Sequence, residues 1–217
     1  MSEHDVTTLD QLRDLYRAPS KLVQEKKGTV IEGAAAEFVA RSPFCCLATA
    51  GPDGSCDVSP RGGPAGQLKL LRDGRTVALP DLNGNNLIDS LTNIVANPWA
   101  GLLVMIPGSD ETMRIDGPAR LTADPEVLGL WSEELRPPKL AILIDVDAAF
   151  LHCAKAFRRG GVWKPETWPE VDGRDAPKMF NAIVGTDHDP SAMRDALEEG
   201  YKVGLAEDLA EDLAAAD

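Results

Sequence analysis

Two short polar runs interrupt apolar, strand-like segments in the first half of the chain. They are Ser59-Pro60-Arg61-Gly62 and Pro80-Asp81-Leu82-Asn83-Gly84-Asn85. Glycine, proline and asparagine where a strand ends favour loops, and loops on a β framework commonly hold ligands. A helix expected directly after Asn85 would point backbone N–H groups and the positive end of its dipole at this turn. The two runs therefore predict an anion site that suits a phosphate.

A basic cluster follows in the second half of the chain, within the run His152-Cys153-Ala154-Lys155-Ala156-Phe157-Arg158-Arg159. In a protein of net charge −13, such a cluster indicates an anionic ligand that is held by local charge. Trp163 and Trp168 come shortly after it, and an aromatic side chain beside cations suits a planar ligand with an anionic tail. The alternatives are a solvated basic helix face and, for His152, a structural histidine at the end of a strand.

Two further arginines, Arg114 and Arg120, fall on one predicted strand. Their separation along the chain is even, so both side chains project from the same face of the strand. This face is either exposed to solvent or in contact with a ligand or a second subunit, and both alternatives stay open.

Strand-like segments place these residues. Residues 44–50 are apolar, and the turn at residues 51–54 leads into residues 55–59, which predicts a hairpin. Residues 67–71 and 75–80 flank a second turn at Asp73-Gly74. Two hairpins in series indicate an antiparallel meander. Later strands are expected at residues 99–106, 113–121 and 140–147.

Helices are expected on either side of the strands. Apolar side chains recur at helical spacing in residues 7–18, 29–41, 86–96 and 124–131. The simplest interpretation of the first two helices is that they cover one end of the β framework. After Asp189, the leucines Leu205, Leu209 and Leu213 recur every four residues among acidic side chains. This narrow stripe predicts a helix that either docks on the partner subunit of a dimer or frays in solution.

Composition limits the class of protein. A chain of 217 residues is long enough for one sizeable core, and we expect one domain with appendages. The net charge of −13 argues against a nucleic-acid partner, because phosphate neutralisation needs a basic surface. No apolar window approaches the length of a membrane span, and residues 1–6 do not have the apolar core of a signal peptide. We therefore expect no membrane partner and a cytoplasmic location.

The four cysteines are Cys45, Cys46, Cys56 and Cys153, and none forms a C-x-x-C pair. The adjacent Cys45 and Cys46 point to opposite faces of a strand, which argues against a zinc site. We interpret the cysteines as small buried hydrophobic residues in a reducing compartment, and we predict no metal site.

The order of motifs along residues 10–170 resembles that of the pyridoxamine 5′-phosphate oxidase-related flavoproteins. It is most similar to a bacterial subgroup marked by a Ser-Pro-Arg-Gly run and a His-Cys-x-Lys-Ala run. The motifs are, in order, residues 44–49, Gly54, Ser59-Pro60-Arg61-Gly62, Pro80, Gly84-Asn85, Asp89-Ser90-Leu91, Asn93-Ile94, Asn97-Pro98, Pro107-Gly108, Glu111-Thr112-Met113-Arg114, Gly117, Ala119-Arg120 and His152-Cys153-Ala154-Lys155-Ala156. Each motif alone is weak, but their joint order is specific.

The resemblance implies a mainly β fold with flanking helices (α+β), namely an antiparallel split β-barrel of the FMN-binding type. It also implies a homodimer with FMN bound at the subunit interface. Three segments are then expected. Residues 1–41 are N-terminal helices that pack on the barrel, residues 42–170 are the FMN-binding split barrel, and residues 171–217 are an acidic helical extension.

The same resemblance assigns the candidate cofactor site. Ser59, Pro60, Arg61 and Gly62 would lie along the flavin ring and ribityl chain, and Pro80, Asp81 and Asn85 would lie beside the phosphate. Arg114 would approach from an adjacent strand. Lys155, Arg158 and Trp163 would close the site, from the same subunit or from the second one.

The chain departs from the subgroup at three positions where basic residues are usual. Asn86 and Leu87 stand directly after Gly84-Asn85, and Thr92 stands further along. Each charge-assisted hydrogen bond lost in this way would weaken phosphate binding by about 1.5–3 kcal/mol. Arg159, which replaces a residue that is not usually basic, offers a compensating charge.

The function that the resemblance implies is an FMN-dependent oxidoreductase acting on a small organic substrate, although no catalytic residues can be assigned. Two alternatives remain. One is a haem- or tetrapyrrole-binding relative that uses His152. The other is a non-catalytic flavin-binding module, which the departure at Asn86 and Leu87 favours.

Overall fold

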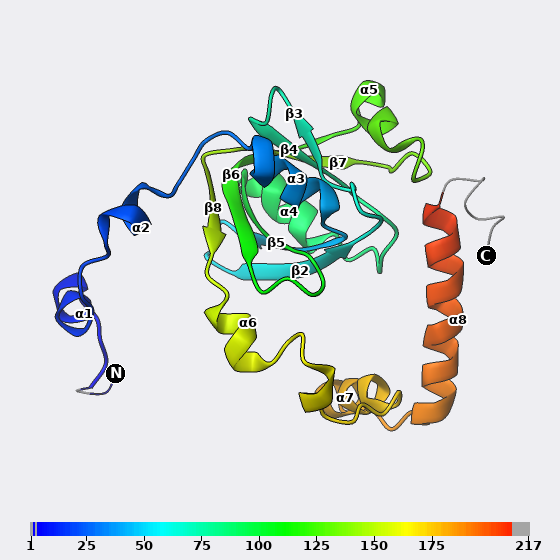
Figure 1. Cartoon of the computed structure of the whole chain (residues 1–217). Coiled ribbons are helices and arrows are strands. Elements are labelled where there is room, and N and C mark those ends of the chain that lie inside the picture. The colour runs from blue at the N-terminus through cyan, green and yellow to red at the C-terminus, as the bar shows by residue number, and fades with distance from the viewer. Residues whose placement is uncertain (1, 3, 210–217) are drawn as a thin grey trace.

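Strand β1 (Phe44–Ala50) alternates its side chains between the core and an outer face, so one face of the sheet is buried. Cys45 and Leu47 are fully buried, whereas Ala48 points outward and is exposed. The strand pairs antiparallel with β2 (Cys56–Gly62) on one edge and with β5 (Trp99–Met105) on the other. Figure 1 shows the computed structural model, which describes residues 2 and 4–209.

The strands are antiparallel throughout the described chain, in the order β2-β1-β5-β6-β7-β4-β3, and β8 pairs with β6. The remaining strands are β3 (Lys69–Leu71), β4 (Thr76–Pro80), β6 (Thr112–Thr122), β7 (Ala141–Asp145) and β8 (Ala148–His152). The predicted hairpins β1–β2 and β3–β4 are both present, but they lie at opposite ends of this order.

Strand β6 belongs to both halves of the sheet. Its residues 112–116 pair with β8, and its residues 119–122 pair with β7. Gly117 lies between the two stretches, where an added Cβ atom would come within 1.8 Å of the carbonyl oxygen of Asp145. The absence of a side chain therefore lets β6 pass from one half-sheet to the other. The prediction of a mainly β, antiparallel split barrel with flanking helices is confirmed.

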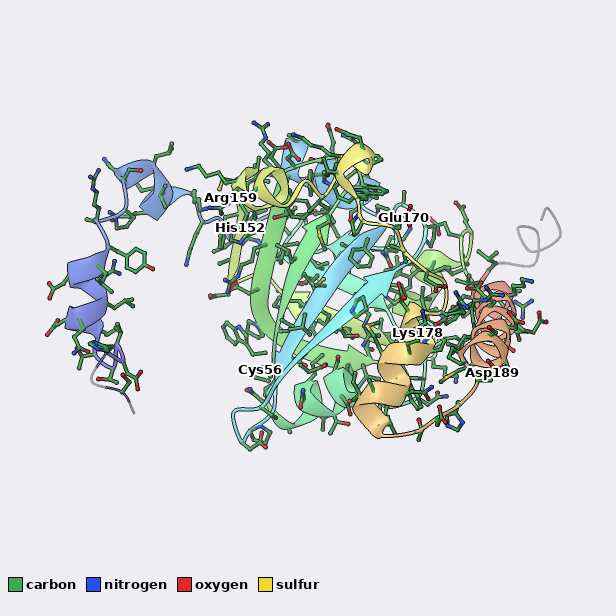
Figure 2. The ribbon with its side chains drawn as sticks, turned by 90° about the horizontal axis from the view of Figure 1, so that it is seen from below. Cys56, His152, Arg159, Glu170, Lys178 and Asp189 are labelled. Carbon is green, nitrogen blue, oxygen red and sulfur yellow. The ribbon has the colours of Figure 1, made fainter. Side chains whose placement is uncertain are left out.

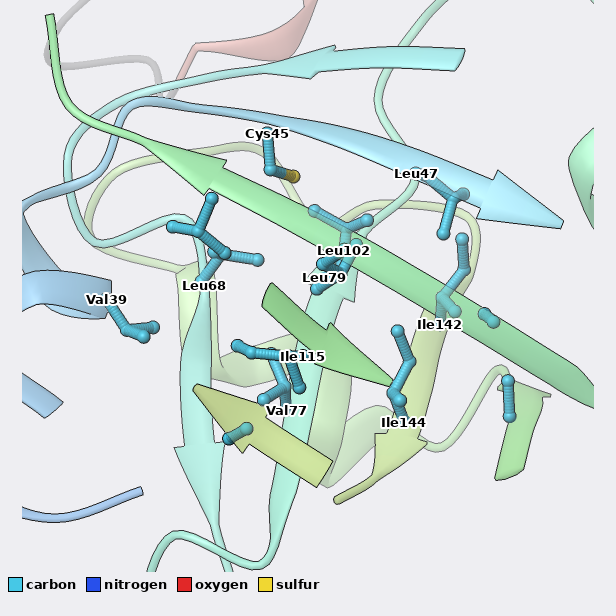
Figure 3. Close-up of a cluster of buried hydrophobic side chains, with 14 of the residues drawn as sticks. Val39, Cys45, Leu47, Leu68, Val77, Leu79, Leu102, Ile115, Ile142 and Ile144 are labelled. Carbon is cyan, nitrogen blue, oxygen red and sulfur yellow. The ribbon is translucent and has the colours of Figure 1, made fainter. Parts of the chain in front are cut away.

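Aliphatic side chains from both halves of the sheet fill the barrel (Figure 3). They include Leu47, Leu102 and Ile115 from one half and Val77, Leu79, Ile142 and Ile144 from the other, each at most 1 % exposed. Helix α4 (Asp89–Ala96) packs on β1 and β6 and adds Leu91 and Ile94, while α3 (Gly33–Arg41) adds Val39. Burial of each such side chain contributes about 1.5–3 kcal/mol to the free energy of folding. This core is therefore the main source of the stability of the barrel.

A smaller core forms around Trp131 on the other side of β4 and β7. The indole is fully buried among Ala78, Ala141 and Leu143, and its Nε1 donates a hydrogen bond of 2.8 Å to the carbonyl oxygen of Gln67. Trp131 ends a short helical segment formed by α5 (Pro125–Leu128) and a 3-10 turn. This contact fixes the chain just before β3.

Two helices begin later than the spacing of apolar residues predicts. Residues 29–32 precede α3 as extended chain, and the Ile31 amide donates to the Gly74 carbonyl oxygen across 2.9 Å. Asn86 and Ile88 adopt φ values of 59° and 53°, which break the helical path ahead of α4. Residues 81–88 consequently form a loop, and we call them the 81–88 loop.

The N-terminal and C-terminal parts of the described chain leave the barrel next to each other, at β8, and then run in different directions (Figure 1). The N-terminal part holds α1 (Leu9–Leu15) and α2 (Lys21–Glu25), and all side chains from residue 4 to residue 29 are exposed. Of the segment expected to pack on the barrel, α3 does so in this structure. The C-terminal part holds α6 (Lys155–Gly160), α7 (Asp175–Val184) and α8 (Pro190–Asp208).

The leucine stripe expected near the C-terminus is only partly described. Leu205 is exposed on α8, and Leu209 forms an isolated β-bridge with Leu135. Leu213 lies outside the described residues.

None of the helices within residues 4–209 combines the length and the apolar character that crossing a membrane requires.

Candidate functional site

A cavity of about 370 Å³ opens between the end of β2 and the 81–88 loop. The residues predicted from the two polar runs line it together, namely Ser59, Pro60, Arg61, Gly62, Pro80, Asp81 and Asn85. The two runs meet although β2 and β4 are not neighbours in the sheet, because the two half-sheets fold over each other. We call this cavity the Arg61 cleft.

Arg61 and Asp81 form an ion pair across the cleft. The Arg61 Nη1 atom donates to Oδ1 of Asp81 at 3.0 Å, and the two side chains are 20 % and 21 % exposed. The Nε atom of Arg61 is buried and has no hydrogen-bond partner among the described residues. A buried donor without an acceptor costs about 1–3 kcal/mol, so an acceptor on a bound ligand would offset that cost.

Hydrogen bonds hold the 81–88 loop at its first residue, within the loop and on its outer side. The Asp81 amide donates to the Leu140 carbonyl oxygen at 2.9 Å, and the Asn85 side chain accepts from the Leu87 amide at 3.1 Å. On the outer side, the Asn83 amide donates to Oδ1 of Asp208 at 3.0 Å. The end of α8 therefore reaches the loop that lines the cleft.

Other lining residues were not assigned individually to the site from the sequence. Leu82, Asn83 and Gly84 belong to the second polar run, which was predicted as a whole. Gln67, Asn86, Ile88 and Leu91 were not predicted as site residues. Asn86 directly follows the glycine- and asparagine-rich run, and that composition is the signal that could have found it. Gln67 is different, because its place at the cleft depends on the Trp131 contact and on a hydrogen bond of 2.7 Å from its Nε2 to the Pro43 carbonyl oxygen.

A second cavity, of about 360 Å³, lies along the 81–88 loop towards α8. The two cavities share Asp81, Asn83 and Asn86, and the second adds Arg136 and Lys139 together with the acidic end of α8. The loop is thus a wall common to both cavities. A shift of this loop would change the shape of the Arg61 cleft.

Four predicted site residues do not line the Arg61 cleft. Arg114 lies on the outer face of β6, 3.2 Å from Asp116, and Lys155 is exposed at the start of α6. Arg158 forms an ion pair with Asp110 at 2.8 Å, and Trp163 donates from Nε1 to the Ser109 carbonyl oxygen at 2.7 Å. In this copy, Arg158 and Trp163 hold the segment after β8 against the β5–β6 turn.

His152 lies among cations, away from the Arg61 cleft. Burial lowers the pKa of His152, and the nearby Lys26 and Arg114 lower it further. Its ring lies 5.2 Å from the ring of Phe150, over which Lys26 and Lys27 also lie. Figure 2 places His152 and Arg159 at a different end of the barrel from Cys56. Burial and the neighbouring cations both favour the neutral imidazole.

The cysteines divide into buried and exposed ones. Cys45 is buried as expected, and burial raises the pKa of its thiol to about 12, an effect that Arg61 partly opposes. Cys56 and Cys153 are exposed, which differs from the expectation that all four are buried. A neutral thiol is a poor nucleophile, so Cys45 is a packing residue beside the cleft.

Within the described chain, no group of three or more metal-ligating side chains is placed to hold a metal ion.

A family model described as pyridoxamine 5′-phosphate oxidase matches residues 31–153 of this chain, which contain every strand and the Arg61 cleft. Solved structures also match it, with low identity. A putative pyridoxamine 5′-phosphate oxidase from Lactobacillus delbrueckii is 16 % identical, with a TM-score of 0.46 over 58 % of this chain and 98 % of that one.

Two other solved structures are also similar to this chain. A pyridoxamine 5′-phosphate oxidase-related, FMN-binding protein from Nostoc punctiforme is 16 % identical, with a TM-score of 0.43 over 55 % of this chain and 82 % of that one. HutZ, a haem storage protein from Vibrio cholerae, is 15 % identical, with a TM-score of 0.40 over 56 % of this chain and 94 % of that one. No curated protein matches the sequence.

Proposed function

This chain belongs to the pyridoxamine 5′-phosphate oxidase family, and from that premise we propose that it binds FMN in the Arg61 cleft and acts as an oxidoreductase on a small organic substrate. One observation carries the proposal. Two polar runs that are separate in the sequence line one cavity, and the cavity holds an arginine whose buried Nε has no acceptor among the described residues.

The residues of the cleft fit the polar parts of a flavin mononucleotide. Arg61 offers a cationic donor, and Asn83, Asn85 and Asn86 bring amide groups to the opposite wall. Charge-assisted donors of this kind hold phosphate and flavin carbonyl oxygens. The Asp81 carboxylate by itself would repel a bound anion, but its negative charge is paired with Arg61.

The residues of this chain would position the ligand and exclude water. FMN, when bound, supplies hydride or electron transfer at its ring. The Arg61 guanidinium would stabilise negative charge on the bound ligand, and Asp81 would hold that guanidinium in place. Ile88 and Leu91 form an apolar part of the wall and would limit the access of water.

The absorbance spectrum of the freshly purified protein tests cofactor binding. We expect flavin bands, release of FMN on denaturation, and uptake of added FMN by the apoprotein. A Soret band would instead favour a tetrapyrrole, and substitution of His152 should then abolish it. A colourless protein that takes up no FMN would contradict the proposal.

A separate experiment tests oxidoreductase activity. The FMN-loaded protein is reduced without oxygen and mixed with a panel of small organic oxidants, with free reduced FMN as the control. Reoxidation faster than that of free FMN supports an enzyme. Equal rates across the panel would instead support a non-catalytic flavin-binding module.

We further propose that the chain forms a homodimer through the outer face of β1, β2 and β5. Val58 is 67 % exposed and Trp99 is 46 % exposed, and the strand register places both on this face with Ala48. Contiguous exposed apolar surface is typical of interaction sites. In such a dimer, Arg114, Lys155, Arg158 and Trp163 would approach the partner's cleft, which accounts for their positions outside the cleft of their own copy.

Light scattering after size-exclusion chromatography tests the dimer. Val58→Asp should convert a dimer to a monomer. It should also reduce the FMN content, because residues of the partner would no longer approach the cleft. Val171→Asp introduces the same charge at a side chain that is 81 % exposed elsewhere, and it should change neither quantity. A Val58→Asp protein that stays dimeric and keeps its full FMN content would contradict this interface.

A further inference from the structure

The N-terminal arm, residues 7–27, has an apolar stripe that no other described residue of its own copy covers. Leu9, Leu12 and Tyr16 recur at helical spacing and are 78 %, 42 % and 66 % exposed. Helix α1 is nevertheless well encoded, because Thr8 and Gln11 form a complete capping box at its start. A helix of seven residues is marginal in water by itself. Such a helix needs a surface to pack on.

Helix α7 has a second uncovered apolar face. Met179, Phe180, Ile183 and Val184 fall at helical spacing and are 59 %, 42 %, 85 % and 55 % exposed. Four large apolar side chains on one helix face form a surface that water solvates poorly. This face and the stripe on the arm are thus both exposed apolar helix surfaces.

The arm and the region around α8 carry opposite net charges. Residues 13–27 of the arm hold five basic and two acidic residues, which gives a net charge of +3. Residues 187–208, which contain α8, hold seven acidic and two basic residues, which gives −5. Opposite charges attract and fix the orientation of apolar surfaces that meet. The arm and the α7–α8 region therefore match in both apolar character and charge.

The two segments of one copy point away from each other. The arm is anchored where it joins the barrel, because Gly28 and Ala149 exchange backbone hydrogen bonds of 2.9 and 2.7 Å. Just before this point, Lys26 donates from Nζ to the Leu151 carbonyl oxygen at 2.9 Å. Figure 1 shows α1 and α2 to the left of the barrel, α7 below it and α8 to its right, and Figure 2 also shows the arm well apart from α7 and α8. The arm therefore does not pack on α7 and α8 of its own copy.

We propose that the arm of one copy packs against α7 and α8 of a second copy. Because a twofold axis relates two identical chains, the second arm makes the same contact in return, and both uncovered faces are closed at once. The proposal is independent of FMN, since neither the arm nor α7 lines the Arg61 cleft.

Cross-linking of isotope-labelled full-length protein tests whether the contact joins two copies. Unlabelled and 15N-labelled chains are mixed, allowed to exchange, and treated with a carbodiimide, which joins lysine amines to carboxylates without a spacer. We expect cross-links from Lys21 to Glu198 or Glu199 in peptides that combine both isotopes. Cross-links confined to chains of one isotope, or none between these segments, would overturn the proposal.

Hydrogen exchange with matched variants tests the faces themselves. Leu12→Asp should raise the amide exchange rate of α7 at least about tenfold, and Ile183→Asp should do the same for α1. Val95→Asp places the same charge on an exposed side chain of α4 and should alter neither helix. Unchanged exchange on α7 in Leu12→Asp would overturn the proposal, and so would protection of the arm that appears only with phosphatidylserine vesicles.

Discussion

Arg61 on β2 and Asp81, directly after β4, are joined by a hydrogen bond of 3.0 Å between Nη1 and Oδ1, across a cleft that three asparagines also line. The pair uses one N–H of the guanidinium and leaves the buried Nε without an acceptor among the described residues. The pair therefore forms part of the wall of the cleft and leaves one guanidinium donor unsatisfied.

Replacing Arg61 tests its part in ligand binding. Arg61→Ala should weaken FMN binding about ten- to a hundredfold, because a hydrogen bond to a charged group is worth about 1.5–3 kcal/mol. The quenching of FMN fluorescence during titration measures the dissociation constant. Arg120→Ala removes an arginine that pairs with Asp145 outside the cleft and should leave the affinity unchanged. Equal affinities for all three proteins would exclude Arg61 from the site.

The two uncharged residues after Asn85 should differ in importance. Asn86 lines the cleft, whereas Leu87 is 64 % exposed and does not line it. Asn86→Lys should therefore strengthen FMN binding about tenfold, while Leu87→Lys should have little effect.

The Asn86→Lys gain has a cost that can be measured separately. Lysine tolerates a φ of 59° less well than asparagine, so the free energy of unfolding should fall by about 1 kcal/mol. Calorimetry of the apoprotein gives this value. If Leu87→Lys strengthens binding and Asn86→Lys does not, the ligand lies elsewhere along the loop.

Asp145 makes stability depend on pH. The Thr76 hydroxyl donates to its Oδ1 at 2.7 Å, and this bond, with Arg120 and Arg72 nearby, lowers the pKa of the Asp145 carboxyl. Because the folded-state pKa is depressed, the stabilisation is complete above the ordinary value of about 3.9 and is lost as the pH falls through the lower value.

Thr76→Val tests this linkage. It should lower the free energy of unfolding by about 1 kcal/mol at pH 7, and the difference from the original protein should shrink below about pH 4. Urea denaturation at pH 7, 5 and 3 measures it. Thr92→Val, at an exposed threonine, is the control. A deficit that stays constant across this range would show that the hydroxyl does not act through the carboxylate.

Gly117 should be the least replaceable glycine of the barrel. Gly117→Ala forces a Cβ atom towards the Asp145 carbonyl oxygen, which cannot move without breaking the junction of the two half-sheets. We expect a loss of about 3 kcal/mol or more, measured by thermal denaturation. Gly129→Ala meets no atom within 4 Å and should be tolerated. Equal stability of the two variants would mean that β6 can shift to relieve the contact.

Local pattern determined much of this protein. Alternation of apolar side chains predicts β1, and turn residues predict the hairpins that follow it, because burial and turn chemistry leave a signal in neighbouring residues. The polar runs at Ser59 and Pro80 are identified as candidate site residues for the same reason. The start of α4 was predicted too early, since left-handed φ values at Asn86 and Ile88 have no clear signal in apolar spacing.

Tertiary structure decided what these elements do together. Arg61 meets Asp81 because β6 passes from one half-sheet to the other at Gly117, and Gln67 is held at the cleft by Trp131 and by the Pro43 carbonyl oxygen. The contact of Asn83 with Asp208 joins residues 125 positions apart. Such contacts depend on which strands become neighbours and on how the core packs. They are settled by the free energy of the whole fold, which no short stretch of sequence contains.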